Sequence, residues 1–382
     1  MKRLFVMATV LITLVLLPFP AQAAALTVAG KSSLLMDVAT GTVLQESNAH
    51  EKLAPASVTK VMTMLLIMEA VDSGKIAMTD TVTASEAAAA KGGSQIYLKV
   101  GETMSVSDML KSIAVSSAND CACAMAEHIA GSEEAFVAQM NARAAELGMK
   151  DTHFVNCTGL DDGANAAEHK TSAYDIAVMS RELLKNHPDI KKFTTIWMDT
   201  VRNGTFGLSN TNKLVRFYQG ATGLKTGFTS GAGYCLSATA QRDGMELIAV
   251  VMGADTSASR NAACKQLLDY GFANFALIQP ELPEPEPVPV KLGNADSVDA
   301  ILGEVGGILV DKAQKNAVSM ELSLLEGVTA PVSRGQRLGT LTVKAGEQIL
   351  QEVPLVAEQG VQRLSFGDLF GMVLRRAAMA KV

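Results

Sequence analysis

Apolar runs of high β propensity stand near both ends of the first 275 residues and predict an antiparallel sheet. Residues 32–38 and 42–46 are two such runs around a short turn, and they predict a hairpin that opens the fold. Residues 234–241 and 245–253 are two more, and the Asp-Gly pair between them suits a tight hairpin turn. We expect the early and late hairpins to share one sheet.

Helical patterns fill the chain around these hairpins. Residues 58–71 are apolar on nearly every side, which predicts a helix that starts at Pro55 and is buried in a core. Residues 84–186 are rich in alanine with helical spacing and predict a helical insert, in which Ser132 is expected to cap a helix. Residues 261–275 predict a closing helix. The predicted fold class is α+β, an antiparallel sheet flanked by helices with a helical insert.

The C-terminal third has a different pattern. Prolines interleaved with glutamates predict a stiff linker at residues 279–290. Residues 291–360 alternate short apolar runs with glycine and charged turns, which predicts a small β domain. Residues 361–382 predict an amphipathic helix with basic residues near its end. The apolar face comprises Phe366, Leu369, Phe370, Val373, Leu374 and Ala377. We predict that this helix lies in a membrane interface; the alternative is a helix docked on its own protein.

The first residues read as a signal peptide, residues 1–23. Lys2 and Arg3 precede an apolar run that ends near Phe19, and a small-x-small cleavage site follows it. A retained membrane helix is the alternative, but the run is short for a span of about 20 residues. We therefore expect residues 24–278 to form an exported domain that works at the outer face of the cytoplasmic membrane, in the cell wall space.

Composition narrows the class of protein. The chain has 382 residues, of which 48% are hydrophobic and 19% charged, so it can bury the cores of two domains. Its net charge of -6 argues against a general nucleic-acid surface. The five cysteines are odd in number and irregularly spaced, which predicts buried apolar packing and leaves one disulfide open. The five histidines lack ligand spacing, and we expect neither a metal nor a cofactor.

Ser57-Val58-Thr59-Lys60 is the first candidate for chemistry. A serine and a lysine three residues apart lie on one helix face, so the lysine amine can take the proton of the serine hydroxyl. Lys60 must be a neutral amine for this, and both burial and a nearby cation such as Lys225 would lower its pKa. In the alternative, Lys60 pairs with an acid at a helix edge. The four-residue pattern is weak when it stands alone.

Ser117-Ala118-Asn119 is the second candidate. Taken alone, Ser117 or Asn119 would cap a helix over residues 120–130. In company with the first motif, Ser117 can relay a proton to a leaving amine, and Asn119 can hold a substrate amide or orient Lys60.

Lys225-Thr226-Gly227 is the third candidate. Lys225 supplies a positive charge, and Gly227 lets another backbone come close to a strand to which a peptide can add. Thr229 lies on the same run, and Lys225 with Thr229 would suit a free carboxylate at a peptide's C-terminus. An ordinary surface strand is the alternative, but it does not explain the order of the three motifs.

In that order the motifs resemble the signature set of serine acyl enzymes such as penicillin-binding proteins and class A β-lactamases. From about residue 32 to 275 the chain resembles the D-alanyl-D-alanine carboxypeptidases of the low-molecular-mass penicillin-binding protein family. The segments that carry this likeness are Pro55-Ala56-Ser57-Val58-Thr59-Lys60, Ser117-Ala118-Asn119-Asp120, Gly223-Leu224-Lys225-Thr226-Gly227-Phe228-Thr229 and Leu267-Leu268-Asp269-Tyr270-Gly271-Phe272.

The resemblance implies a penicillin-binding or β-lactamase-like transpeptidase fold and removal of the terminal D-alanine from the peptidoglycan stem pentapeptide. It implies Ser57 as the acylated nucleophile, Lys60 as its base, and the N–H groups of Ser57 and Phe228 as an oxyanion hole. It also implies that Ser117 and Asn119 assist and that β-lactams acylate the enzyme. The Phe228 side chain stands where some relatives have histidine.

Two other functions stay open at this point. A β-lactamase shares the three motifs, but the Glu-x-x-Leu-Asn pattern of class A enzymes is missing between Ser117 and Lys225. A non-catalytic wall-binding protein with a vestigial site is the second, and the intact motifs speak against it. Endopeptidase action on cross-links is a close variant of the predicted activity.

Overall fold

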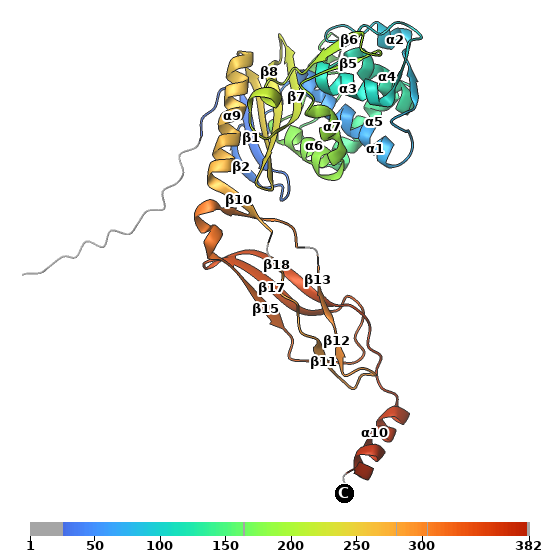
Figure 1. Ribbon diagram of the computed structural model, residues 1–382, viewed down its shortest axis with the longest axis vertical. Coiled ribbons are helices and arrows are strands. Elements are labelled where there is room, and N and C mark those ends of the chain that lie inside the picture. Colours follow the sequence, from blue (N-terminus) through green and yellow to red (C-terminus); the bar gives the residue numbers. More distant parts are fainter. Residues whose placement is uncertain (1–25, 163–164, 280, 304, 380–382) are drawn as a thin grey trace, which may run out of the picture.

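The structure, a computed structural model, has three parts that follow one another along its long axis (Figure 1). A mixed α/β part comes first, an all-β part follows, and a separate helix ends the chain. The predicted signal peptide lies outside the described residues. The structure describes residues 26–162, 165–279, 281–303 and 305–379.

One five-stranded antiparallel sheet organises the first part, in the order β2-β1-β9-β8-β7. Its strands are β1 (Ser32–Asp37), β2 (Val43–Ser47), β7 (Ala221–Thr229), β8 (Gly233–Arg242) and β9 (Met245–Ala254). Both predicted hairpins are confirmed, and β1 pairs with β9, so the two ends of this part meet in one sheet. Strand β7 lies at the edge, which leaves one side of its backbone free of a neighbouring strand.

Helices cover both faces of this sheet (Figure 1). Helix α9 (Ser257–Asn274) packs on one face over Leu35 and Leu247, and the insert packs on the other over Leu34 and Ile248. Because neighbours along β1 and β9 point into different cores, these strands are apolar throughout and do not alternate. The helices between β2 and β7 are α1 (Lys60–Asp72), α2 (Glu86–Ala89), α3 (Val106–Ser116), α4 (Asn119–Ala130), α5 (Glu133–Glu146), α6 (Ala173–Asn186), α7 (Lys191–Thr194) and α8 (Leu214–Phe217). Helices α2 to α6 fall within the predicted insert, and Leu214 of α8 packs in the same core as α9.

Helix starts follow local chemistry more closely than the apolar pattern. The Ser132 side chain accepts a hydrogen bond from the backbone N–H of Ala135, which confirms it as the cap of α5. Helix α9 begins at Ser257, four residues before its predicted start, because Thr256 and Ser259 form a reciprocal capping box. The first part also has two short hairpins that the sequence did not predict. They are β3 (Thr81–Thr83) with β4 (Thr103–Ser105) and β5 (Met198–Val201) with β6 (Phe206–Ser209).

The predicted small β domain is present after residue 281. Its strands are β11 (Val288–Lys291), β12 (Ser297–Val298), β13 (Ala300–Leu302), β14 (Ile308–Asp311), β15 (Val318–Leu324), β16 (Val328–Thr329), β17 (Arg337–Ala345) and β18 (Gln348–Ala357). Aliphatic side chains such as Leu338 and Leu341 fill its core. Strand β10 (Phe275–Ile278), directly after α9, pairs with β14, so one small sheet joins the two parts.

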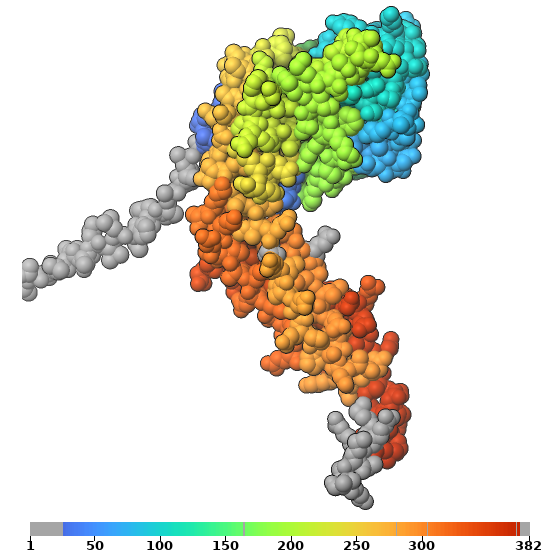
Figure 2. Space-filling view, viewed as in Figure 1, coloured from blue at the N-terminus to red at the C-terminus, as the bar shows by residue number. Residues whose placement is uncertain are grey.

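Helix α10 (Phe366–Met379) projects from the far end of the β domain, and Figure 2 shows it at the tip of the molecule. Its apolar side chains face solvent: Phe366 is 85% exposed, and Phe370, Val373 and Leu374 are also exposed. Among the described residues, no helix has both the length and the apolarity needed to cross a bilayer.

Candidate active site

Ser57 lies on a tight turn that leads into α1. The prediction of a helix from Pro55 is corrected here, because residues Ala56–Thr59 form a 3₁₀ turn and the α-helix begins at Lys60. Ala56 has a positive φ of 48°, a conformation that costs free energy for a residue with a side chain. Contacts from several directions hold this turn in place.

Two glycines enclose the turn. A Cβ at Gly159 would lie 1.9 Å from the carbonyl oxygen of Ala56. A Cβ at Gly227 would lie 2.7 Å from the Pro55 oxygen and 3.0 Å from the Ser57 nitrogen. Strand β7 therefore approaches the backbone of Ser57 as closely as two chains can, which is the role predicted for Gly227.

A buried histidine supports the same turn from behind. The Val155 N–H donates to Nδ1 of His169, so Nε2 carries the ring proton and donates to Thr59 Oγ1 over 2.8 Å. Thr59 Oγ1 in turn donates to the carbonyl oxygen of Ala56. Burial, together with nearby cations, lowers the pKa of His169 to about 4, so the ring is neutral at physiological pH. His169 was not singled out from the sequence.

Ser57 and Lys60 are paired as the first motif predicts. Lys60 Nζ lies 2.9 Å from Ser57 Oγ and donates to the carbonyl oxygen of Thr158 over 2.8 Å. The Lys60 side chain is fully buried, and burial lowers its pKa to about 7, against opposing effects of Cys157 and Asp120. A large fraction of Lys60 is therefore a neutral amine near pH 7 and can accept a proton.

The loop that binds Lys60 is ordered by one asparagine. The Asn156 Oδ1 accepts hydrogen bonds from the backbone N–H groups of Thr158 and Gly159, and its Nδ2 donates to the carbonyl oxygen of Leu160. These bonds aim the Thr158 carbonyl at Lys60. This loop has no periodic pattern in the sequence, because its structure depends on one polar side chain.

Ser117 and Asn119 lie where α3 ends and α4 begins. Neither caps α4, which starts at Asn119 after Ala118 with no side-chain cap, so the capping interpretation is wrong. Ser117 has a left-handed φ of 63°, and Asn119 Nδ2 donates to the carbonyl oxygen of Gly92. Within the described part of the chain, Ser117 Oγ and Asn119 Oδ1 are buried without a hydrogen-bond partner. Such atoms are costly to bury unless a ligand pairs with them.

The third motif lies on the edge strand β7, directly beside Ser57. Thr226 Oγ1 donates to Thr211 Oγ1, and both residues face the cleft. Lys225 is only 1% exposed, and its Nζ donates to the Thr226 carbonyl. Burial and the nearby Lys60 lower the pKa of Lys225 well below its ordinary value. Lys225 is therefore covered by the strand in the absence of a ligand, and its role in binding a carboxylate stays a prediction.

Thr229 lies at the end of the same strand, and its role in binding a carboxylate also stays a prediction. Its Oγ1 accepts a hydrogen bond from the backbone N–H of Ala232 in the turn after β7, and Thr229 is not among the residues that line the cleft. Phe228 does line it, with an exposed ring that packs against Tyr234.

Together these elements form a cleft of about 270 Å³. It is lined by Ser57, Ser94, Ser117, Thr211, Thr226, Gly227, Phe228, Tyr234, Ser257 and Arg260. Arg260, on the first turn of α9, is the cation that reaches this lining, with its guanidinium held by Ser257 Oγ and Asn261 Oδ1. No motif in the sequence points to Arg260, because α9 is far from the three motifs along the chain. No trio of His, Cys, Asp or Glu side chains in the described ranges gathers as metal ligands would.

Comparison with known proteins decides the family. The sequence model of the D-alanyl-D-alanine carboxypeptidases matches residues 19–256, and that of the penicillin-binding protein 5 C-terminal domain matches residues 282–363. The chain belongs to the D-alanyl-D-alanine carboxypeptidase family. The resemblance stated from the motifs is thus confirmed, and the carboxypeptidase assignment is favoured over a β-lactamase or a non-catalytic wall-binding protein.

Relatives of this carboxypeptidase match it along most of their length. It is 44% identical to D-alanyl-D-alanine carboxypeptidase DacF of Bacillus subtilis over 96% of each chain. It is 34% identical to DacC of Escherichia coli over 89% of this chain and 85% of that one. The crystal structure of penicillin-binding protein 5 from Haemophilus influenzae superposes with a TM-score of 0.78 at 31% identity, over 88% of this chain and 98% of that one. The predicted fold class is confirmed, including the C-terminal β domain.

Proposed function

We propose that this D-Ala-D-Ala carboxypeptidase works through an acyl-enzyme on Ser57, with Lys60 as the base. The observation that carries the proposal is the 2.9 Å pairing of Ser57 Oγ with a buried Lys60 whose pKa is about 7. Ser57 Oγ attacks the carbonyl carbon of the penultimate D-alanine, and its proton passes to Lys60 Nζ. The terminal D-alanine then leaves with its amine protonated, and water hydrolyses the ester.

The peptide substrate is proposed to add to the free edge of β7. An extended chain there would hydrogen-bond to the strand and bring its carbonyl beside Ser57. The N–H groups of Ser57 and Phe228 would donate hydrogen bonds to the oxyanion. Gly227 makes this possible, because it has no side chain to separate β7 from the turn that carries Ser57. Ser117 Oγ and Asn119 Oδ1, which are unpaired among the described residues, would gain partners from the leaving amine and the substrate amide.

The free carboxylate of the substrate is proposed to bind Arg260, with the Thr226 hydroxyl beside it. Arg260 and Thr226 both line the cleft and Lys225 does not, although all three side chains are buried in the absence of a ligand. A guanidinium can bind a carboxylate through two parallel hydrogen bonds, which suits a chain end. Lys225 would support the strand from beneath through its hydrogen bond to the Thr226 carbonyl, and Thr229 would shape the turn that ends β7.

Peptidoglycan stem peptides and β-lactams are the proposed ligands of this cleft. A relative from Listeria monocytogenes, penicillin-binding protein D2, was solved in an ampicillin-bound form. It is 31% identical to this chain, with a TM-score of 0.59, over 65% of this chain and 99% of that one.

Mass spectrometry of the intact protein after penicillin treatment, followed by peptide mapping, tests the site. The adduct is expected on Ser57, and D-alanine release from a pentapeptide is expected to stop when it forms. An adduct on another residue, or D-alanine release that persists in the fully labelled protein, would refute the assignment.

We also propose that the protein is exported and binds the membrane surface through α10. Support comes from the exposed apolar side chains of Phe366, Phe370 and Val373 and from the basic residues at the end of the sequence. The full chain from residue 24 is expected to sediment with anionic vesicles, and a chain that ends at Gly360 is not. Leu325→Ser, which removes an exposed apolar side chain from the β domain, is the matched control and should sediment normally. Equal sedimentation of both chain lengths would refute the proposal.

A further inference from the structure

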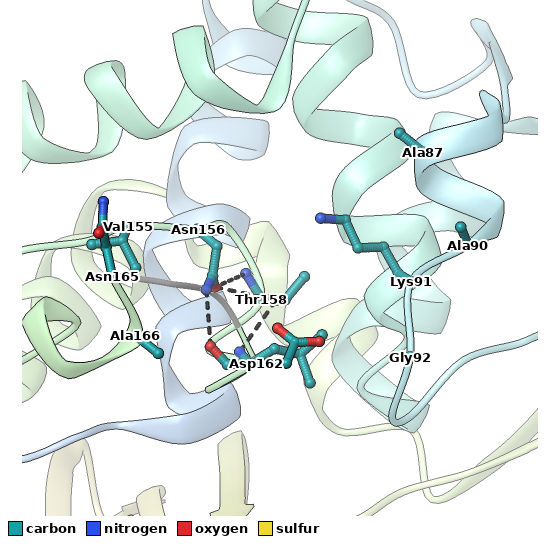
Figure 3. Close-up of a pocket in the computed structure, with 11 residues that line it drawn as sticks. Ala87, Ala90, Lys91, Gly92, Val155, Asn156, Thr158, Asp162, Asn165 and Ala166 are labelled. Carbon is teal, nitrogen blue, oxygen red and sulfur yellow. Dashed lines mark hydrogen bonds between the residues drawn. The ribbon is translucent and has the colours of Figure 1, made fainter.

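A second cavity, of about 510 Å³, lies beside the cleft and is larger than it. Figure 3 shows its two walls, which come from different parts of the chain. One wall is α2 with the residues after it, including Ala87, Lys91 and Gly92. The other is the loop that contains Thr158 and Asp162. Neither the motifs nor the proposed chemistry of Ser57 uses this cavity.

The cavity and the catalytic groups share two pieces of backbone. The Gly92 carbonyl accepts the hydrogen bond of Asn119 Nδ2, and the Thr158 carbonyl accepts that of Lys60 Nζ. A Cβ at Gly93 would lie 2.8 Å from Asn119 Nδ2 and 3.2 Å from Leu160 Cδ2, so this glycine stands between a catalytic side chain and the cavity lining. A substrate that extends past Asn119 therefore passes the mouth of this cavity.

The distance between the two sites fits one residue of a peptide. Gly92 lines the cavity and Ser94 lines the cleft, and two residues of extended chain span at most about 7 Å. Neighbouring residues of an extended substrate are separated by about half that distance, and their side chains point to opposite faces. The side chain one residue before the penultimate D-alanine is thus within reach of the cavity.

The charges on the cavity walls favour a cationic side chain. Lys91 Nζ is bound to Glu133 Oε2, which compensates its charge. Asp162 has no such ion pair within the described residues and is exposed at the loop wall, where the amide of Asn165 also lies. Asn156 orders the start of this loop through hydrogen bonds with the backbone of Thr158, Gly159 and Leu160. An amine that enters would meet a carboxylate and an amide oxygen, both of which accept hydrogen bonds.

We propose that this cavity receives the side chain of the substrate residue that precedes the two D-alanines, and that Asp162 selects a side chain ending in a primary amine. The inference rests on the proposed function, because it assumes that the substrate lies along β7 with its carbonyl at Ser57. It adds a specificity residue to a wall that lies outside the three motifs.

Two small peptides test the selection. Both are Nα-acetyl-L-lysyl-D-alanyl-D-alanine; in one the ε-amine is free, and in the other it is acetylated. The chain from residue 24 is expected to release D-alanine from the free-amine peptide with roughly tenfold higher kcat/KM, the effect of one charge-assisted hydrogen bond. Equal rates, or a preference for the acetylated peptide, would overturn the inference.

Two neighbouring aspartates supply the variant and its matched control. Asp162→Asn is expected to remove the preference by slowing only the free-amine peptide. Asp161→Asn is expected to keep it, because the Asp161 carboxylate lies near Gly231 and does not line the cavity. If Asp162→Asn keeps the preference or slows both peptides equally, Asp162 is not the selecting residue and the inference fails.

Penicillin acylation separates this inference from the proposed function. The Asp162→Asn variant should be acylated by penicillin at the normal rate, which shows that Ser57 and Lys60 are intact. If the unaltered protein cleaves neither peptide and forms no adduct, the proposed function itself has failed. If it cleaves both peptides equally, the proposed function stands and only the amine selection is refuted.

Discussion

The catalytic part and the C-terminal β domain fill their interiors with different chemistry. The catalytic part buries Lys60, Asp120, His169, Lys225 and Arg260. Among the described residues beyond 260, no polar or charged side chain is buried, and the core of the β domain is wholly aliphatic. Buried polar groups cost free energy unless they are paired, so a fold retains them where they serve a purpose. We therefore expect substitutions of buried residues to affect catalysis in the first part and only stability in the β domain.

Asp120 illustrates how the catalytic part satisfies its buried charges. Its carboxylate accepts hydrogen bonds from the backbone N–H groups of Ile96, Leu98 and Cys121. Those bonds hold the loop that carries Ser94 into the cleft. The β domain needs no such arrangement, because aliphatic packing alone specifies its strands.

The largest predicted effect comes from removing the nucleophile. Ser57→Ala is expected to lower kcat for D-alanine release by roughly a millionfold, as in other serine enzymes that lose their nucleophile. The measurement is D-alanine release from a pentapeptide, with the circular dichroism spectrum and Tm as controls for folding. Substantial activity in a folded Ser57→Ala protein would show that Ser57 is not the nucleophile and that the buried polar groups around it do not serve catalysis.

The next effect comes from the close approach of β7 to the nucleophile. Gly227→Ala places a methyl group 2.7 Å from the Pro55 oxygen, so strand and turn must separate. Loss of one oxyanion donor costs roughly a hundredfold or more in rate, and we expect that loss in penicillin acylation. Gly306→Ala in the β domain is the matched control, since its Cβ would meet no atom within 4 Å. Equal acylation rates for the two variants would contradict the proposed geometry.

The pH dependence of acylation compares two lysines. Burial lowers the pKa of Lys60 to about 7, so the amine is neutral above that pH and protonated below it. The rate constant for penicillin acylation should therefore fall about tenfold per pH unit below about pH 7 and level off above it. Lys344 lies on the β domain and is partly exposed, and a hydrogen bond to Glu321 raises its pKa. Lys344→Met should leave the profile unchanged, whereas a flat profile in the unaltered protein would exclude Lys60 as the base.

The smallest effect on catalysis is predicted for the core of the β domain. Leu341 is fully buried there, and Leu341→Ala should destabilise that domain by about 2–5 kcal/mol. The kcat/KM for a soluble peptide should stay unchanged at a temperature where the domain remains folded. The measurements are the midpoint of urea unfolding and the rate of D-alanine release. A loss of activity in the folded variant would mean that the β domain takes part in the chemistry.

Much of the fold could be predicted from local pattern. The buried helix α1 and the hairpins of the sheet are marked by continuous apolar runs, and α10 is marked by apolar residues at helical spacing. The order of the motifs along the chain predicts that Ser57, Lys60, Ser117 and the strand of Lys225 lie together. These predictions needed only neighbours along the chain and the rule that apolar faces must be covered.

The parts that were missed depend on contacts between distant segments. The burial of Lys225 follows from how β7 packs on the turn of Ser57, which no single segment encodes. His169 supports that turn from 110 residues away, and Arg260 reaches the cleft from the last helix of the catalytic part. Ser117 was read alone as a cap, because a left-handed φ at a serine has no signal in the sequence. Side chains that act through tertiary contacts produce no periodic pattern in the sequence, so they cannot be found from it.

The two glycines beside the Pro55–Thr59 turn limit how this enzyme can evolve under antibiotic pressure. Any larger residue at 159 or 227 would press on the turn that carries Ser57, so a change there that shuts out a drug would also harm the natural reaction. Heritable resistance at this target should instead arise at the rim, where side chains such as Phe228 are exposed and have room to change.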